Sequence, residues 1–207
     1  MTENNKNMHG KSNIVRLSGI LEEEFVYSHY TFEQGFFRNR IVVKRLSGAE
    51  DHIPIVRSER FAMPAFAKGK AIELVGTFRS KNVFDQNGRK HVSRFVFPRD
   101  VQVYESSEEL SNLNENFIYL EGNICMPPVF RKTPLGRTIT EVILAVRRGG
   151  YDKWDYIPCI AWGNNAYLVK ALDVGSHLKL EGRIQSRLYE KEGDVRETYE
   201  VSIFKIE

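Results

Sequence analysis

Hydrophobic and polar positions alternate with a period of two along most of this chain. Between residues 178 and 187, apolar residues and a glycine occupy one parity, namely Leu178, Leu180, Gly182 and Ile184. The other parity is polar, with Lys179, Glu181, Arg183, Gln185 and Arg187. This is the period of a β-strand that buries one face. The pattern therefore predicts half-buried strands in a sheet.

The same pattern predicts five strands in each half of the chain. Besides the strand from Leu178, those of the second half cover residues 116–126, 137–148, 155–162 and 195–206. Besides the strand with Ile72, Leu74, Gly76 and Phe78, those of the first half cover residues 13–21, 38–46, 52–58 and 92–104. A glycine in mid-strand suits a bulge or bend where a small barrel curls tightly.

One segment of each half is predicted to be helical. In the second half it covers residues 164–172, with Asn164 able to cap its start and Gly175 shortly after its end. Five strands with one helix between the third and fourth is the layout of an OB barrel. The pattern therefore predicts an OB barrel in each half.

An internal repeat connects the two halves. Four segments match in order and nearly in register: 13–19 with 116–122, 43–45 with 146–148, 51–54 with 155–158, and 69–76 with 175–182. Such a series indicates a duplicated domain. We therefore predict an all-β protein of two tandem five-stranded OB-fold barrels, each with one short helix between strands 3 and 4. The domains are expected at residues 12–105 and 116–207, with a polar linker at 106–115.

Charge adds little to this prediction. Lys and Arg outnumber Asp and Glu by 15 to 11 over residues 12–105, and the two groups are equal at 13 each over residues 112–207. The balance leaves room for a basic face without proving one. No apolar run reaches the roughly 18 residues of a membrane span, and the N-terminus does not resemble a secretory signal. We expect a soluble, cytoplasmic, nucleoid-associated protein.

Catalytic and metal-binding patterns are not found in the sequence. The five histidines are scattered, with no nucleophile elbow, phosphate-cradling glycine loop or metal-ligand spacing around them. Asp152 and Asp155 are expected to be solvated at a turn. Cys125 and Cys159 lie in apolar strand-like segments and are expected to be reduced core residues. We predict no enzymatic activity, no cofactor and no metal.

The second half resembles the bacterial single-stranded DNA-binding protein family. The resemblance rests on linked motifs at residues 116–123, 131–136, 144–148, 155–163 and 181–189. The first half resembles the family more loosely, since Ser58-Glu59 stands where the second half has Trp162-Gly163. The resemblance implies binding of single-stranded DNA without sequence specificity, in replication, recombination or repair.

Such binding needs cations for the phosphates and flat rings for the unpaired bases. By resemblance, Tyr156, Trp162 and Tyr189 are the stacking residues, and Arg183 and Arg187 contact phosphates. Around the loop between the second and third strands we add Arg147, Arg148, Tyr151 and Trp154. In the first half we add Lys44, Arg45, Arg57, Arg79 and Lys81. The alternative is that the rings pack in or beside the barrel and that the arginines are solvated partners of glutamates.

The first half has His52, Ser58 and Val83 where the second has its three stacking rings. Phe84 and the pair Phe36-Phe37 can stack on bases or belong to the core. We therefore expect the first barrel to contribute electrostatics and the second to contribute rings.

Assembly and partners follow only from the resemblance. It implies a homodimer, which gives four barrels. The family's acidic C-terminal recruitment tip is not evident, because the sequence ends in the strand-like segment 201–207. This suggests a specialised relative serving primosome assembly, a plasmid or a mobile element. The alternatives are an RNA-binding OB protein and a primosome-type or protein-interaction module with weak nucleic-acid binding.

Overall fold

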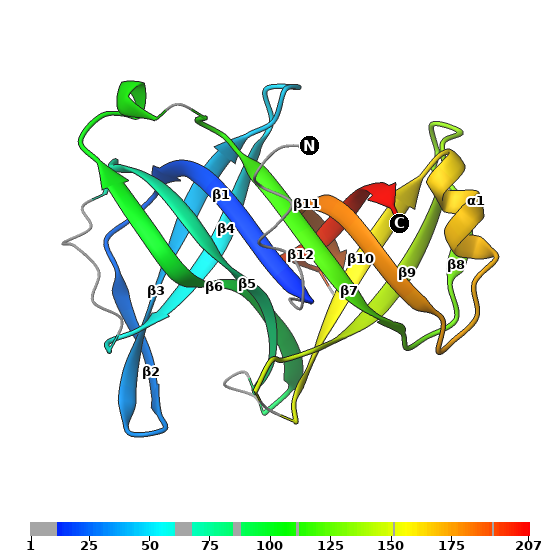
Figure 1. The fold of residues 1–207 in the computed structure, drawn as a ribbon, viewed down its shortest axis with the longest axis horizontal. Helices are drawn as coiled ribbons and strands as arrows, with labels where there is room; N and C mark the ends of the chain where they lie inside the picture. The colour runs from blue at the N-terminus through cyan, green and yellow to red at the C-terminus, as the bar shows by residue number, and fades with distance from the viewer. Residues whose placement is uncertain (1–11, 61–67, 85–87, 111, 151, 192) are drawn as a thin grey trace. The chain divides into compact units, whose positions relative to one another are not determined.

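The structure is a computed structural model that describes residues 12–60, 68–84, 88–110, 112–150, 152–191 and 193–207 (Figure 1). Contacts between residues divide the chain into two compact units. The first-copy unit consists of Val15–Phe117 and Ile184–Tyr199, and the second-copy unit of Ile118–Arg183 and Glu200–Glu207 with residues 12–14. Residues 184–199, which belong to the second copy of the repeat, thus lie in the first-copy unit. The division at residues 105 and 116 stays a prediction.

The first-copy unit is a barrel with an added hairpin. Its strands are β1 (Asn13–Leu21), β2 (Val26–Thr31), β3 (Gln34–Lys44), β4 (Glu50–Ser58), β5 (Ala71–Phe84) and β6 (Lys90–Tyr104). β5 pairs with β1 and β6, β3 pairs with β4 and returns to β1, and a parallel β4–β6 pairing closes the ring. β2 pairs with β3 outside this ring, and the two form a long hairpin (Figure 1).

The second-copy unit repeats this topology. Its elements are β7 (Asn116–Ile124), β8 (Val129–Lys132), β9 (Thr138–Arg147), β10 (Trp154–Trp162), α1 (Asn164–Lys170), β11 (His177–Lys191) and β12 (Asp194–Ile206). β7 pairs with β9 and β11, and a parallel β10–β12 pairing completes the barrel. The predicted all-β class with OB-like barrels is confirmed.

The helix of the second copy lies where the sequence predicts it, between the third and fourth barrel strands. Its predicted cap is wrong, because Asn164 is the first helical residue and the N-cap is Gly163, at φ 55°, with no side-chain capping bond. The helix expected in the first copy falls between β4 and β5, where residues 61–67 lie outside the described residues.

The barrel interiors consist of the inward parity of each strand. In the first-copy unit the fully buried side chains include Leu17, Ile53, Leu74 and Phe78, and in the second-copy unit they include Leu120, Leu144, Ile157 and Leu180. Burial of each such side chain stabilises the fold by about 1.5–3 kcal/mol. Along β9, for example, Val142, Leu144 and Val146 are buried, whereas the residues between them and Arg147 are more exposed.

Glycines of the repeat lie where strands approach most closely. A Cβ on Gly182 would lie 2.5 Å from the carbonyl oxygen of Ser202, and one on Gly76 would lie 2.5 Å from that of Phe97. At Gly76 the β5–β6 register also shifts, which is the predicted bulge. The mid-strand glycines therefore let the sheet curl where the sequence predicts it.

Both cysteines are free thiols. Cys159 is buried in β10, and Cys125 is half-buried after β7. Burial raises the pKa of each thiol above its ordinary value. Within the described ranges, no helix has the length and apolar character needed to cross a membrane.

Candidate nucleic-acid interface

A cation and two aromatic rings lie on the outward face of β9 and β10 in the second-copy unit. Across the antiparallel ladder Arg147 is opposite Trp154, and Ala145 is opposite Tyr156. The side chains of Trp154 and Tyr156 are 42% and 50% exposed. Arg147 is also exposed and makes no ion pair with any carboxylate in the part of the chain that the structure describes. We call Arg147, Trp154 and Tyr156 the outward row.

The opposite parity of the same strands explains this arrangement. Val146, Asp155 and Ile157 are fully buried, so that residues alternating with them must face outward. The small side chain of Ala145 stands opposite Tyr156 and leaves the ring accessible. The three predicted contacts of the outward row are therefore exposed on adjacent strands.

Arg148 has a structural partner. Its Nε and Nη2 donate to the two carboxylate oxygens of buried Asp155, at 2.9 and 2.7 Å. This two-point ion pair joins the ends of β9 and β10. The expectation that Asp155 is solvated is wrong, because a buried carboxylate is stable only when it is paired and hydrogen-bonded. The role of Arg148 as a phosphate contact stays a prediction.

The repeat places the same pair in the first-copy unit. Arg45 donates through Nε to Asp51 at 2.8 Å, and through Nη2 to the other oxygen of that carboxylate. Lys44, the neighbouring predicted contact, is exposed, and its Nζ lies 3.6 Å from Glu50. Of these two cations, Lys44 is therefore the one that faces solvent.

Trp162 lies half-buried at the end of β10. Its indole N–H donates to the hydroxyl of Ser202 on β12 at 3.2 Å, which supports a packing role beside the predicted stacking role. Arg183 is half-buried on β11 in the same unit. Tyr151, another predicted contact, lies outside the described residues.

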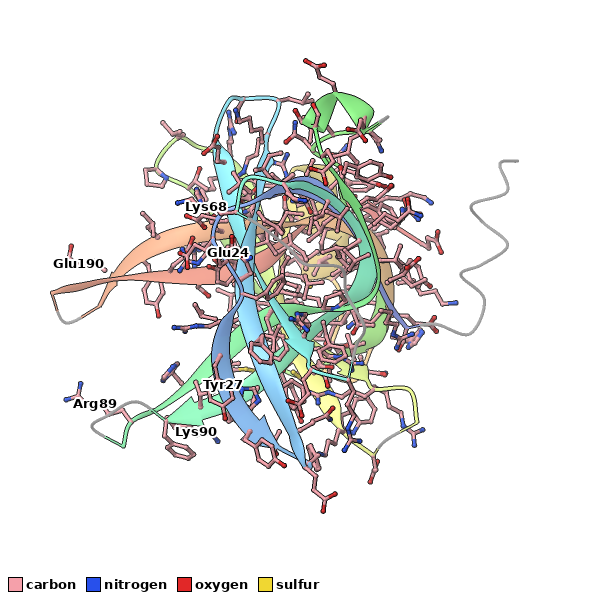
Figure 2. All side chains as sticks on the ribbon, turned by 90° about the vertical axis from the view of Figure 1, so that its left-hand side faces the viewer. Glu24, Tyr27, Lys68, Arg89, Lys90 and Glu190 are labelled. Atoms are coloured by element: carbon pink, nitrogen blue, oxygen red, sulfur yellow. The ribbon has the colours of Figure 1, made fainter. Side chains whose placement is uncertain are left out.

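Arg187 and Tyr189 lie on the distal part of β11, in the first-copy unit. The alternation predicted for this strand ends here, since Gln185 is 9% exposed whereas Leu188 and Tyr189 are 68% and 39% exposed. Glu190 lies near the end of the hairpin that β11 forms with β12 (Figure 2). The predicted stacking rings are thus divided, with Tyr156 and Trp162 in one unit and Tyr189 in the other.

Arg57 on β4 is engaged by two rings. Its guanidinium carbon lies 4.9 Å from the centre of Phe25 and 5.1 Å from that of Phe37. Burial lowers the pKa of this guanidinium, although it stays charged at neutral pH. Of the other predicted cations on the first copy, Arg79 is half-buried and Lys81 is exposed, both on β5.

The first-copy unit also exposes three aromatic rings that the sequence analysis missed. Tyr27, Tyr30 and Phe32 on the β2–β3 hairpin are 60%, 64% and 73% exposed. Phe84 on β5, for which the sequence left stacking and core packing open, is 70% exposed and so lies outside the core. Figure 2 shows Tyr27 on this hairpin, and Arg89 and Lys90 at the end of the β5–β6 hairpin. The first copy lacks rings at His52, Ser58 and Val83, as the sequence shows, but it exposes other rings elsewhere. The expected division between an electrostatic barrel and a stacking barrel stays a prediction.

The available indication of the first strand of this hairpin was a short segment with several residues that favour strands. Val26–Thr31 contains two tyrosines among polar residues. The turn itself is unusual, because Phe32 and Glu33 both have positive φ, at 50° and 56°. Such two-residue turns ordinarily contain Asn-Gly or Asp-Gly, so the sequence carries no turn motif here.

Comparison with known proteins finds relatives of the second copy by sequence. Residues 115–207 match the model of the single-strand binding protein family. The chain is 28% identical over 92 residues to single-stranded DNA-binding protein 2 of Streptococcus agalactiae serotype V, covering 42% of this chain and 70% of that protein.

Solved structures show the same fold over nearly the whole chain. The wild-type single-stranded DNA binding protein from Thermus aquaticus matches with a TM-score of 0.73 and 19% identity, over 94% of this chain and 91% of that one. A deletion variant of that protein matches with a TM-score of 0.72 and 20% identity, over 94% and 93% of the two chains. Residues 115–207 therefore match the single-strand binding protein family, and the whole chain, with its two OB-like domains, shares its fold with the Thermus aquaticus protein.

Proposed function

We propose that this protein binds single-stranded DNA largely without sequence specificity and catalyses no reaction on it. The observation that carries this proposal is the outward row, in which exposed Arg147 faces exposed Trp154 across the β9–β10 ladder and Tyr156 follows on the same face. The family match over residues 115–207 supports the same function.

The chemistry of the outward row suits an unpaired strand. The guanidinium of Arg147 neutralises a phosphate, and the rings of Trp154 and Tyr156 offer flat surfaces to bases. Every base has a flat face, so stacking works for any sequence and contributes about 1–3 kcal/mol per base. In a duplex the bases are paired and stacked on one another, so they are not available to stack on these rings.

The other predicted residues extend the proposed surface. Lys44, Lys81 and Arg187 are exposed, and they supply further positive charge in the first-copy unit. Trp162 and Tyr189 remain proposed stacking residues, with partial exposure of each ring supporting the assignment. A Trp162→Ala, Tyr189→Ala double variant that folds and binds with wild-type affinity would remove this pair from the site.

Intrinsic fluorescence tests the proposed function directly. Titration with poly-dT at low salt should quench the emission of Trp154 and Trp162, and added salt should weaken the binding. Poly-rU and duplex DNA should compete less well than unlabelled poly-dT. Absence of quenching and of binding at low salt would contradict the proposal. Stronger competition by poly-rU would instead assign the surface to RNA.

We also propose that two chains associate, so that the functional assembly has four OB barrels. The support is the family resemblance, in which four barrels usually act together. Light scattering at micromolar concentration should give the mass of two chains. The mass of one chain would contradict this assembly and leave DNA binding by the outward row unaffected.

A further inference from the structure

The short helix α1 of the second-copy unit exposes apolar side chains on its outer side. Tyr167 and Leu168 are 53% and 58% exposed. Ala166 and Val169 are buried where the helix packs against β8, β9 and β10, so the barrel core uses only its inner side. A helix whose outer side meets only water ordinarily carries polar residues there. Tyr167 and Leu168 are therefore candidates for contact with a partner.

The apolar surface continues from α1 onto β8. The ring centre of Phe130 on β8 lies 5.3 Å from that of Tyr167. The ammonium nitrogen of Lys170 lies 4.3 Å from the centre of the same Phe130 ring, within cation–π distance. Figure 1 shows α1 beside β8, and the two elements are in contact. The three side chains thus form one contiguous surface that spans two elements.

The turn between β8 and β9 extends this surface. It lies beside the start of the helix, because the backbone N–H of Gly163 donates to the carbonyl oxygen of Thr138 at 3.1 Å. Leu135 in this turn is 85% exposed. A contiguous group of exposed apolar side chains is typical of an interaction site. We call this group the helix face, and it consists of Phe130, Leu135, Tyr167 and Leu168.

Three cations border the helix face, and none of them is ion-paired within the described ranges. They are Lys132 on β8, Arg137 just before β9 and Lys170 on α1. Arg131 has the other parity on β8 and is paired with Glu141 at 2.6 Å. Asp173, after the helix, is one exposed carboxylate against these three cations. The border is therefore positive, and charge complementarity favours an acidic partner.

The helix face is separate from the outward row. β8 pairs with residues 138–141 of β9, whereas Arg147 and Trp154 are paired at the opposite end of that strand. A single strand held by the outward row therefore leaves the helix face accessible to another molecule.

The chemistry of the helix face also differs from that of the outward row. Leu135 and Leu168 are aliphatic and offer no flat surface on which a base can stack. The ring of Phe130 already contacts Tyr167 and the ammonium group of Lys170. The helix face therefore suits apolar side chains of a protein better than the bases of a single strand.

We propose that the helix face binds an acidic segment of a partner protein. An aliphatic or aromatic side chain of that segment packs against Tyr167 and Leu168, and its carboxylates pair with the bordering cations. This interaction goes beyond the proposed function and does not depend on DNA binding. The chain then holds a single strand through the outward row and a second protein through the helix face.

Selection from a library of short random peptides displayed on phage, with the full chain as the bait, tests this proposal. The enriched peptides should combine Asp or Glu with Leu, Ile or Phe. Binding of one enriched peptide, labelled with fluorescein, should be weakened about tenfold by Leu168→Ser and by Lys170→Glu. Both side chains are exposed, so both variants should unfold like the wild type.

The matched controls change the same residue types in the first-copy unit. Leu188→Ser and Lys90→Glu replace an exposed leucine and an exposed lysine there, and both should bind the peptide like the wild type. Leu168→Ser and Lys170→Glu should keep the wild-type affinity for poly-dT. These comparisons separate the helix face from a general effect of charge or of apolar surface.

The other outcomes overturn the helix face as a peptide site. They are no enrichment of acidic, apolar peptides, or equal weakening in the variants and their controls. Loss of poly-dT affinity in folded Leu168→Ser and Lys170→Glu would assign the face to DNA. A mass that falls from two chains to one in Leu168→Ser, measured by light scattering, would assign it to a second copy of this chain. A wild type that binds the peptide but not poly-dT overturns the proposed function and leaves the helix face intact.

Discussion

The carboxylate of Asp51 accepts a hydrogen bond from the backbone N–H of Ser186 at 2.8 Å. Asp51 is fully buried on β4, and the two-point ion pair with Arg45 occupies the same carboxylate. The distal part of β11 is thereby fixed to the barrel of the first-copy unit. A buried carboxylate is stable only when such donors pair with it. Removing one partner of the pair is therefore strongly destabilising.

Substitution of Asp51 should therefore be costly. Asp51→Ala removes the carboxylate that pairs with the guanidinium of Arg45 and accepts the N–H of Ser186. We expect the free energy of unfolding to fall by about 3–5 kcal/mol, measured by urea denaturation. Glu50→Ala is the control, because its carboxylate is 41% exposed and its ion pairs are loose. Similar stabilities for the two variants would show that the pair is dispensable.

Gly182 should not accept a side chain. The alanine Cβ would lie 2.5 Å from the Ser202 carbonyl oxygen and 2.8 Å from a methyl group of Val201. β12 cannot move away without disturbing the core, so Gly182→Ala should destabilise the protein by about 1–3 kcal/mol in thermal or urea unfolding. In Gly149→Ala the added methyl group meets no atom within 4 Å and stability should change little. A Gly182→Ala variant with wild-type stability would show that β11 and β12 do not approach this closely at Gly182.

Tyr119 should make stability depend on alkaline pH. Burial, with help from the charge and hydrogen bond of Glu121, raises the pKa of its phenol to about 12. The unfolded phenol ionises near pH 10, so this contribution is complete below about pH 10 and is lost as pH rises through 12. The difference in unfolding free energy between wild type and Tyr119→Phe should fall by about 2–3 kcal/mol over that range. A constant difference from pH 9 to pH 12 would contradict the assignment.

The two thiols should react at very different rates. Cys159 is 2% exposed, and burial raises its pKa, so a thiol reagent should reach it only when the second-copy barrel opens. Cys125 is half-buried and should react faster. Labelling of Cys125→Ser and Cys159→Ser variants separates the two rates. Rapid labelling of Cys159 under native conditions would place it outside the core.

The barrels were predictable because the alternation of apolar and polar residues within each strand can be read from the sequence. Strand parity identified Leu180 and Ile184 as inward, and both are fully buried in the structure. The alignment of Gly76 with Gly182 showed the repeat. By contrast, the β2–β3 hairpin was missed because Phe32 and Glu33 adopt a left-handed turn without any of the residues that usually signal one.

The groove lined by Arg38 and Arg40 depends on long-range contacts and was not predictable from local patterns. Arg38 and Arg40 share a parity, but only the parallel β4–β6 pairing and the position of residues 197–199 turn that face into a groove. Likewise, the ion pair of Arg148 with Asp155 requires the β9–β10 register, which the sequence leaves open. Charge in the sequence therefore identified candidate cations without showing which are already paired.

The most direct test of base stacking on the outward row is the affinity of a Trp154→Ala, Tyr156→Ala double variant for a labelled oligo-dT. Loss of two stacks should weaken binding by at least about 2 kcal/mol, or roughly 30-fold, with thermal unfolding unchanged. Tyr167→Ala, which removes a 53% exposed ring from α1, should bind like the wild type. Wild-type affinity in the folded double variant would contradict the account.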